Sequence, residues 1–363
     1  MRIGVARALV DGELIDGDVE VVDGRIVAVG LDGKGEGIAA PGFVDLQVNG
    51  FAGVDLVTAD RDAYARAGAA MAATGVVAYQ PTFITGDPDA VLRALDGLAA
   101  LLEDAPPGPR ILGAHLEGPF LSPKRAGTHP PEWLLDPDLD LLDRYLAAGP
   151  VREVTLAPEL PGALDLVEKL TAAGVLVACG HTDADTVAAR EAFDQGARSV
   201  THLFNAMRPM RHREPGMVGV ALTRADVAVP IIVDGVHLAD ETVRLVFAAA
   251  KDRAILVTDA TAAAGMPDGG FDLGEVRLTK YGAEVRRADG TLAGSALTMD
   301  AAVRNVVDLG IDLPAALTAA SITPAALLGE PADGLRPGAA ADMVVLDEDL
   351  GVSRVLRDGE VLA

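Results

Sequence analysis

Cysteine and aromatic residues are scarce in this 363-residue chain, which has a single cysteine, Cys179, and only 4% aromatic residues. One thiol cannot form an intramolecular disulfide, and it is typical of a protein from a reducing compartment. Half of the residues are hydrophobic. A large core must therefore be built mainly from valine, leucine, isoleucine and alanine.

Excess positive charge and long apolar segments are also missing. The formal net charge of −24 excludes a general affinity for nucleic acid or anionic membranes, although one local arginine can still bind a phosphate. No unbroken apolar stretch reaches the length of about 20 residues that spans a membrane, and the N-terminus has no signal-peptide pattern. We therefore predict a soluble cytoplasmic protein without a nucleic-acid or membrane partner.

The middle of the chain alternates short apolar runs with helical patterns. The expected strands cover residues 43–48, 75–83, 111–116, 153–157, 175–180, 198–203, 229–233 and 254–258. Most are almost wholly apolar, as parallel strands covered on both faces are. Helices are expected at 63–73, 89–102, 164–173, 183–195 and 240–250, with Asp183 and Asp240 as N-caps. Eight alternations predict an α/β fold of the (β/α)₈ TIM-like barrel type. An open, doubly wound sheet is the alternative.

The two ends of the chain have a different, β-rich pattern. Short alternating segments surround Asp23-Gly24 and Asp358-Gly359, which are strong hairpin signals. We predict that residues 1–40 and 336–363 together form a small β-sandwich domain, and that residues 41–335 form the barrel. Residues 270–294 interrupt the barrel rhythm, and we expect an inserted β-hairpin there.

Four polar residues follow apolar runs where buried strands would leave the sheet: Glu117, His181, His202 and Asp259. In a barrel of parallel strands these ends converge on the face that carries the active site. His181 and His202 are 21 residues apart, which fits consecutive strand–helix units. Imidazole and carboxylate ligands with open positions favour zinc, and ferrous iron or cobalt also fits.

Each of these positions also has a simpler interpretation. Glu117 precedes Gly-Pro and could satisfy backbone donors of the next loop, and a single buried histidine is more often a packed residue than a ligand. Asp259 is either a helix N-cap or a general base for a water whose pKa the metal lowers to about 7. His237, after the seventh strand, is either a solvated loop residue or a group that polarises a carbonyl.

Three further features carry weaker signals. His115 shares strand parity with Glu117, and we expect it to pack or to support a ligand rather than to be a ligand. Cys179 shares strand parity with His181, and we expect it to be a small buried apolar residue. Arginines surround His212 in an otherwise acidic chain. They form either a solvated loop or an anion clamp.

Several longer motifs occur in a fixed order. The most specific are His115-Leu-Glu-Gly-Pro-Phe and Thr201-His-Leu-Phe-Asn-Ala-Met207, and the others include Pro41-Gly-Phe-Val-Asp, Lys124-Arg-Ala-Gly-Thr-His129, Arg213-Glu-Pro-Gly and Asp234-Gly-Val-His237. With these motifs, which run from about residue 41 to 295, the chain resembles the amidohydrolase superfamily and, within it, the N-acetylglucosamine-6-phosphate deacetylases.

The resemblance implies roles for the strand-end residues. Glu117, His181 and His202 would hold the metal. Asp259 would act first as the base and then as the acid that protonates the leaving amine. His237 would help the metal to polarise the acetyl carbonyl.

The resemblance also implies how a phosphorylated amino sugar binds. The main chain at Asn205 and Ala206 would bind the phosphate together with Arg213. In the family that arginine comes from the neighbouring subunit of a homodimer. His129 would contact sugar hydroxyls.

One departure concerns the His-x-His pair after the first strand, which holds a second metal in many members of the superfamily. Here the equivalent residues are Gln47 and Asn49. Neutral amides are poor zinc ligands beside imidazole, so we expect one divalent cation per chain. Gln47 and Asn49 would instead contact a water or the substrate.

The sequence therefore predicts a metal-dependent enzyme that hydrolyses the acetamide of N-acetyl-D-glucosamine 6-phosphate to glucosamine 6-phosphate and acetate. Two alternatives remain. One is an amidohydrolase for a cyclic amide or another acylated amino sugar, although Val154-Thr-Leu-Ala-Pro-Glu lacks the strand-four lysine of many cyclic amidases. The other is a barrel that has lost catalysis and only binds, although the metal ligands and the base are all present.

Overall fold

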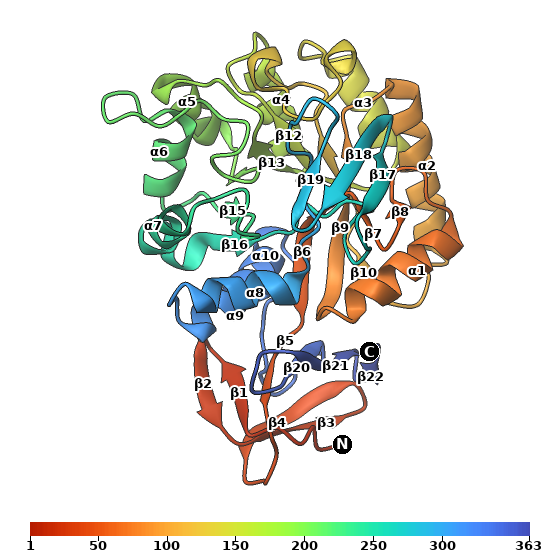
Figure 1. Cartoon of the computed structure of the whole chain (residues 1–363), viewed down its shortest axis with the longest axis vertical. Coiled ribbons are helices and arrows are strands. Elements are labelled where there is room, and N and C mark those ends of the chain that lie inside the picture. The colour runs from red at the N-terminus through yellow and green to blue at the C-terminus, as the bar shows by residue number, and fades with distance from the viewer.

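The computed structural model describes residues 1–363, in which a larger α/β part stands on a smaller β-rich part that contains both termini (Figure 1). Helices surround a curved parallel sheet in the larger part. None of the helices has the length and apolar character needed to cross a membrane.

Six parallel strands form one hydrogen-bonded path. Their order is β6 (Phe43–Val48), β9 (Val76–Ile84), β11 (Ala114–Glu117), β12 (Val151–Leu156), β13 (Leu176–Cys179) and β14 (Ser199–Val200). The short strand β10 (Arg110–Ile111) pairs with the first half of β9, so the expected strand at 111–116 is interrupted before β11. The α/β class that the sequence predicted is confirmed.

Two more parallel strands, β15 (Val229–Ile231) and β16 (Ala254–Leu256), pair with each other. Single bridges connect this pair to the rest: Ser199 to Ala228 beside β14, and Val48 to Ala260 beside β6. Strands are thus present at all eight predicted positions, but the hydrogen bonding between neighbouring strands is not continuous through all eight strands.

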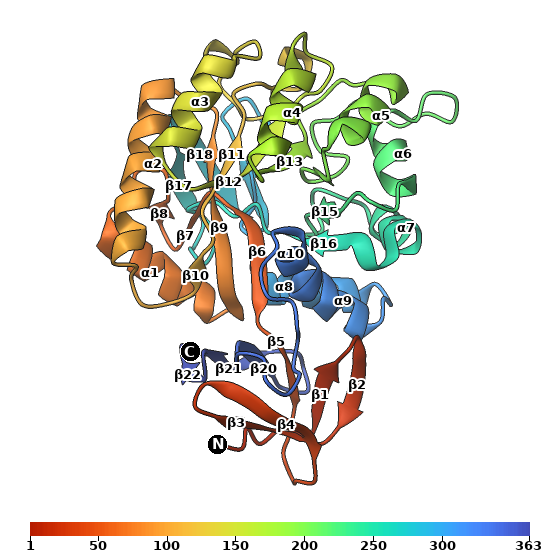
Figure 2. The same cartoon turned by 180° about the vertical axis from the view of Figure 1, so that it is seen from behind.

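Helices follow the strands on the outer face (Figures 1 and 2). They are α1 (Arg61–Ala72), α2 (Pro88–Glu103), α3 (Leu139–Ala148), α4 (Ala163–Ala172), α5 (Thr186–Gln195), α6 (Gly216–Thr223), α7 (Asp240–Ala250), α8 (Met299–Asp308), α9 (Leu313–Ala320) and α10 (Ile322–Leu327).

Both expected N-caps were wrong. Helix α5 begins after Asp185, whose carboxylate accepts hydrogen bonds from the backbone N–H groups of Val187 and Ala188. Asp183 lies before the helix and instead pairs with arginines. Asp240 is already inside the first turn of α7, and Ala239 occupies the cap position. The position of an aspartate in the sequence does not show whether its carboxylate caps a helix or pairs with a side chain distant in sequence.

The β-rich part combines both ends of the chain. Its six-stranded sheet has the order β2 (Glu13–Asp16), β1 (Arg7–Val10), β5 (Ile38–Pro41), β20 (Met343–Leu346), β21 (Val352–Arg357) and β22 (Glu360–Val361). Strands β3 (Asp18–Val22) and β4 (Arg25–Leu31) form a separate antiparallel pair. A core that includes Ile3, Val19, Ile26, Met343 and Leu356 joins the two. Figure 2 shows this part below the start of β6.

The insertion after β16 is larger than the expected hairpin. It is a three-stranded antiparallel sheet of β17 (Gly269–Leu273), β18 (Val276–Tyr281) and β19 (Glu284–Arg286). Its apolar side chains form a small core with Ile84, the last residue of β9. The antiparallel sheet therefore packs against one side of the parallel sheet near its carboxyl edge.

Polar groups lie buried inside the barrel-like sheet below that edge. Asp45 of β6 accepts hydrogen bonds from the backbone N–H of Thr258 at 3.2 Å and from its hydroxyl at 2.6 Å. Burial nevertheless raises the pKa of Asp45 to about 7.

This pKa predicts a pH-dependent contribution to stability. The folded chain keeps a proton on Asp45 between about pH 4, where a free aspartate titrates, and about pH 7. The contribution is therefore complete below pH 4 and is lost as the pH rises through 7. Denaturant unfolding of the Asp45→Asn chain should therefore show a smaller decrease in the free energy of unfolding between pH 4 and 7 than the unchanged chain shows. Parallel curves for the two chains from pH 4 to 8 would contradict the expectation.

Candidate active site

The predicted site residues converge on one cavity of about 370 Å³ at the carboxyl edge of the parallel strands. Glu117 ends β11, His181 and His202 follow β13 and β14 by two residues, and Asp259 follows β16 by three. The cavity is also lined by Asn49, His129, Asn205, Ala206 and His237. Gln47 and Arg213 are not among its lining residues.

Three donor atoms meet at the bottom of this cavity. Oε1 of Glu117 lies 3.1 Å from Nε2 of His181 and 3.0 Å from Nε2 of His202, and the two nitrogens are 3.2 Å apart. Zinc bonds of about 2.0–2.2 Å place neighbouring ligand atoms about 3–3.5 Å apart. The spacing of this buried group therefore fits a single bound cation.

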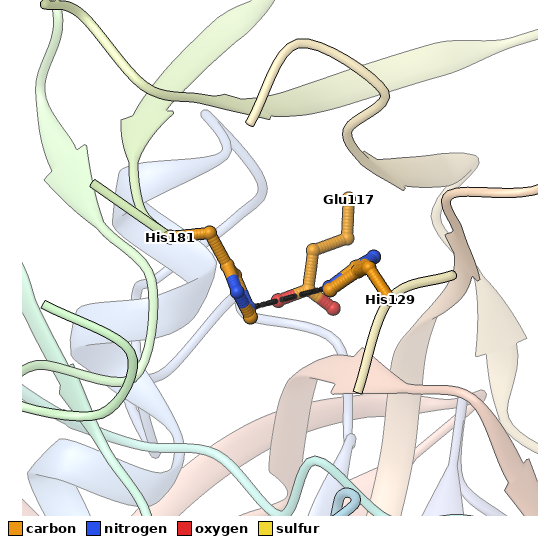
Figure 3. A group of neighbouring side chains, drawn as sticks. All are labelled: Glu117, His129 and His181. Carbon is orange, nitrogen blue, oxygen red and sulfur yellow. Dashed lines mark hydrogen bonds and ion pairs between the residues drawn. The ribbon is translucent and has the colours of Figure 1, made fainter. Parts of the chain in front are cut away.

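Figure 3 shows that His129 also faces this group, with its Nε2 3.3 Å from Nε2 of His181. The second nitrogen of each ring distinguishes their roles. Nδ1 of His181 lies 2.9 Å from the carbonyl oxygen of Arg125, so it carries the proton and leaves a lone pair at Nε2. Nδ1 of His129 instead accepts from the N–H of Thr85 at 3.3 Å. His129 therefore presents a donor at Nε2, which suits an oxygen of a substrate better than a cation.

The charge of Glu117 is stabilised in place. Burial opposes ionisation, but the neighbouring imidazoles of His181 and His202 hold the pKa of Glu117 well below its usual range. Nδ1 of His202 is buried without a partner. A buried carboxylate facing two imidazole nitrogens is the donor set expected of a metal site.

The backbone is strained at three of these strand ends. His181, His202 and Asp259 have φ angles of 45°, 33° and 49°, in the left-handed region that side chains other than glycine rarely adopt. Such strain persists only where surrounding contacts fix it, and it concentrates at functional sites. Sequence patterns gave no signal of it.

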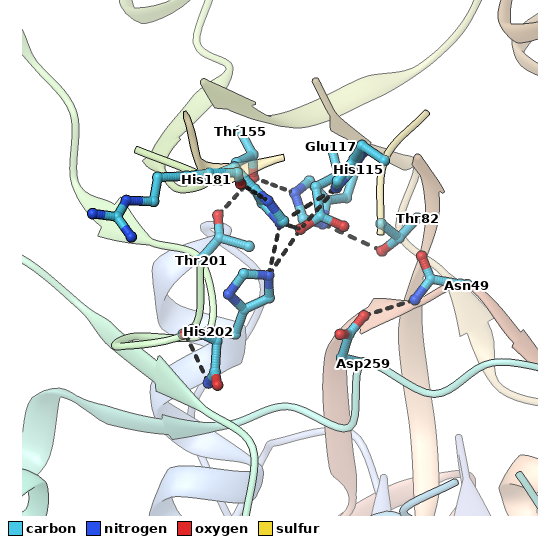
Figure 4. A network of polar contacts seen from close by, with 12 residues as sticks. Asn49, Thr82, His115, Glu117, Thr155, His181, Thr201, His202 and Asp259 are labelled. Carbon is cyan, nitrogen blue, oxygen red and sulfur yellow. Dashed lines mark hydrogen bonds and ion pairs between the residues drawn. The ribbon is translucent and has the colours of Figure 1, made fainter. Parts of the chain in front are cut away.

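Asp259 lies across the cavity from Glu117 and His202 and is held by Asn49 (Figure 4). The amide nitrogen of Asn49 donates to Oδ1 of Asp259 at 2.7 Å. Burial, with a further effect from the charge of Glu117, raises the pKa of Asp259 to about 6. Asn49 thus orients the carboxylate, while the buried amide nitrogen of Gln47 has no partner.

His237 is oriented by a residue to which the sequence assigned no role. Its Nδ1 lies 2.7 Å from Oδ2 of Asp234, and hydrogen bonds from His237 keep the pKa of Asp234 below its usual value although burial opposes this. The Asp-x-x-His spacing of Asp234 and His237 was the only sequence feature that could have indicated this contact. Asp234 thereby fixes the orientation of the His237 ring and leaves Nε2 as the second polar atom of the ring, able to contact a substrate.

His115 and Cys179 are both fully buried and lie outside the cavity lining. His115 contacts the hydroxyls of Thr82 at 3.2 Å and Thr155 at 2.7 Å, and burial lowers its pKa to about 4. Burial raises the pKa of the Cys179 thiol.

The basic residues near the site occupy different positions relative to the cavity. The Arg213 side chain lies at an exposed loop and bonds to His212 at 2.7 Å. Lys124 and Arg125 line the cavity, and their place in the motif at 124–129 was the only signal for them. Arg125 and Arg208 both pair with Asp183, at 2.7 and 3.1 Å.

The segment from Lys124 to His129 supports His181 from outside the cavity. Arg125 supplies the carbonyl that orients His181, and a Cβ added at Gly127 would lie 3.0 Å from Cε1 of that ring. Asp183 fixes Arg125, while Arg287, the residue after β19, donates to the carbonyl of Thr128 at 3.1 Å. The salt bridge between Asp183 and Arg125 thus holds the segment whose carbonyl orients His181.

The fold and this site together define a member of a known hydrolase family. Residues 38–362 match the Amidohydrolase family, and the chain belongs to it. Within the family it is similar to deacetylases of phosphorylated amino sugars, as the motifs predicted.

Three relatives document this similarity. An N-acetylgalactosamine-6-phosphate deacetylase from Escherichia coli O157:H7 is 37% identical, with 97% of this chain and 96% of the relative covered. The human N-acetylglucosamine-6-phosphate deacetylase is 38% identical, with 97% and 90% covered. A deacetylase from Mycobacterium smegmatis, solved in complex with N-acetyl-D-glucosamine-6-phosphate, superposes with a TM-score of 0.95 at 39% identity, with 100% and 99% covered.

The Asp183 contact predicts an effect on metal binding. Asp183→Asn weakens the hold on Arg125 and thereby on His181, so metal affinity should fall about 10–100-fold, as it does when outer partners of ligands are lost. Competition with a chelator would measure it. Asp185→Ala is the control, since it removes only the cap of α5. Equal affinities of the Asp183→Asn and Asp185→Ala chains would contradict the role of Asp183.

Proposed function

We propose that this protein hydrolyses the acetamide of N-acetyl-D-glucosamine 6-phosphate to D-glucosamine 6-phosphate and acetate. It would serve amino-sugar catabolism and the recycling of cell-wall sugars. The observation that carries the proposal is the convergence of Glu117, His181 and His202, with Asp259 across the same cavity, in a chain similar to such deacetylases over nearly its whole length.

Glu117, His181 and His202 are the proposed ligands of one divalent cation, with zinc expected and ferrous iron or cobalt as alternatives. When bound, the cation supplies Lewis-acid polarisation of the amide carbonyl and lowers the pKa of a water. The tautomer of His181 supports its place in the set, because its lone pair at Nε2 faces the other two donors.

Asp259 is the proposed general base and acid. Asn49 occupies Oδ1, so Oδ2 accepts a proton from the attacking water and then delivers it to the departing sugar amine. The pKa of about 6 brings the carboxyl close to the pH at which both transfers are efficient. His237, held by Asp234, donates to the carbonyl oxygen as negative charge develops there.

The sugar phosphate is proposed to bind the main chain at Asn205 and Ala206, with His129 donating to a sugar hydroxyl. The phosphate would also bind Arg213 of a second subunit in a homodimer, which the exposed position of Arg213 outside its own cavity supports. The cytoplasmic location stays a prediction.

The architecture is proposed to follow the same family plan. Residues 41–335 would form a (β/α)₈ barrel closed by the two single bridges beside β14 and β6, with residues 1–40 and 336–363 as one β-sandwich domain.

The direct test is amine release from N-acetylglucosamine 6-phosphate by protein of measured metal content. The unphosphorylated sugar and N-acetylgalactosamine 6-phosphate, named for one relative, are run in parallel. Turnover that requires the metal and prefers the phosphorylated glucosamine derivative supports the proposal. Metal-loaded protein without turnover supports the alternative of a barrel that only binds. Turnover of a different amide supports the alternative of an amidohydrolase for a cyclic amide or another acylated amino sugar.

The Asp259→Asn chain should keep its metal and lose about 10²–10⁴-fold in kcat, which is the usual contribution of a positioned general base. Metal content and turnover are measured on one preparation, so that loss of the cation is distinguished from loss of the base. Nearly normal turnover would remove Asp259 from the mechanism.

The Arg213→Ala chain should show a raised KM for the phosphorylated sugar and little preference over the unphosphorylated one. If Arg213 acts across a dimer, mixing this chain with the Asp259→Asn chain should restore activity, because each mixed dimer then has one intact site. Subunit exchange is checked with two differently tagged chains. No recovery after confirmed exchange would place Arg213 in its own site.

A further inference from the structure

Ile84 separates the active-site cavity from a second cavity. The second cavity has a volume of about 460 Å³ and lies between α1, α2 and the turn at Gly274. Ile84 lines both cavities. Leucine, valine, alanine and tyrosine side chains supply most of the apolar wall on the far side: Leu56, Val57, Ala59, Tyr64, Val91 and Leu98.

The strand register fixes where the Ile84 side chain points. Thr82 of β9 faces the interior, because its hydroxyl contacts His115. Side chains two residues apart share a face of a strand, so Ile84 points inward as well. Ile84 also pairs in register with Glu117 on the neighbouring strand. An apolar side chain therefore lies directly beside the proposed metal ligand.

The antiparallel sheet completes this partition. Leu273 of β17 lines the active-site cavity and shares a small core with Ile84. A Cβ added at Gly274 would lie 4.0 Å from Cδ1 of Ile84. The N–H of Gly274 donates to Asp55 at 2.7 Å, and Glu275 accepts from the indole of Trp133 at 3.1 Å. Asp55 and Trp133 thus hold the turn that lies next to Ile84.

We propose that Ile84, backed by Leu273, forms the end wall of the acyl pocket and restricts the enzyme to short N-acyl groups. The inference rests on the proposed function, which places the phosphate at Asn205 and Ala206. These residues follow β14, four strands along the path from β9. With the amide carbon at Glu117 and the sugar extending toward Asn205, the acyl substituent points toward Ile84.

The consequence is that Ile84→Ala joins the two cavities. The pocket then continues from the reacting carbon into an apolar space that accepts a longer chain. Pockets discriminate by about 10–200-fold for one methylene group, so the change should be large enough to measure.

The test compares kcat/KM for the N-acetyl, N-propanoyl and N-butanoyl derivatives of glucosamine 6-phosphate, all followed by release of the same amine. In the unchanged protein, kcat/KM should fall about 10-fold or more for each added methylene. Ile84→Ala should raise the ratio of butanoyl to acetyl at least about 10-fold, and Ile84→Val should raise it less.

Ile232→Ala is the matched control, because Ile232 is a buried isoleucine of the active-site cavity that does not line the second cavity. Its effect on absolute rate should be the same for all three amides. Metal content and melting temperature confirm that each variant is folded. An unchanged acyl ratio in Ile84→Ala and Ile84→Val, or a shift caused by Ile232→Ala instead, would overturn the inference. Absence of amide hydrolysis in the unchanged protein would instead overturn the proposed function.

Discussion

The arrangement of the site depends on one buried negative charge, that of Glu117. A carboxylate in an apolar interior is costly unless opposite charge or donors surround it. Here His181 and His202 approach it, and a cation among the three donors would complete the compensation. The same charge helps to raise the pKa of Asp259 across the cavity. Glu117 and Asp259 thereby differ in proton affinity although they share one cavity. Such a difference suits one carboxylate to binding a cation and the other to transferring a proton.

Close approach of the donors is achieved through the backbone. The left-handed conformations of His181, His202 and Asp259 turn each side chain sharply out of its strand. The residue before His181 must also be small, since a Cβ at Gly180 would lie 2.6 Å from Cβ of Thr201. Strain and tight packing at the strand ends are offset by the core below them, which is why a barrel edge can carry such a site.

The sequence predicted the strands and the convergence of their ends well, because both follow from local periodicity. Glu117, His181, His202 and Asp259 needed only a parallel sheet to be brought together. The roles of Arg125 and Asp183, and the proposed role of Ile84, could not be predicted in this way. Each acts through a residue distant in sequence, and the carbonyl of Arg125 carries no side-chain signal at all.

The same limit explains the errors in the elements. The cap of helix α5 is Asp185, two residues after the expected Asp183, which instead pairs with Arg125 and Arg208 that only the folded chain brings near. Residues 269–286 form three strands rather than the two of the expected hairpin, because two turns interrupt this segment. The alternation of apolar and polar residues did not show both turns. Domain boundaries rest on such long-range pairings too, and here strand β5 pairs with β1 and β20 from opposite ends of the chain.

Charge also bears on how a phosphate could be bound by so acidic a chain. Arg125 lines the cavity, but its guanidinium is paired with Asp183. Asp183 holds Arg208 as well, and these arginines lower its pKa to about 2. Lys124 lies 3.6 Å from the same carboxylate and is mostly exposed. The positive groups nearest the cavity are thus already engaged in holding the segment that orients His181. A dianion is therefore better served by an arginine with no partner of opposite charge in its own chain, which is the situation of Arg213 on its exposed loop.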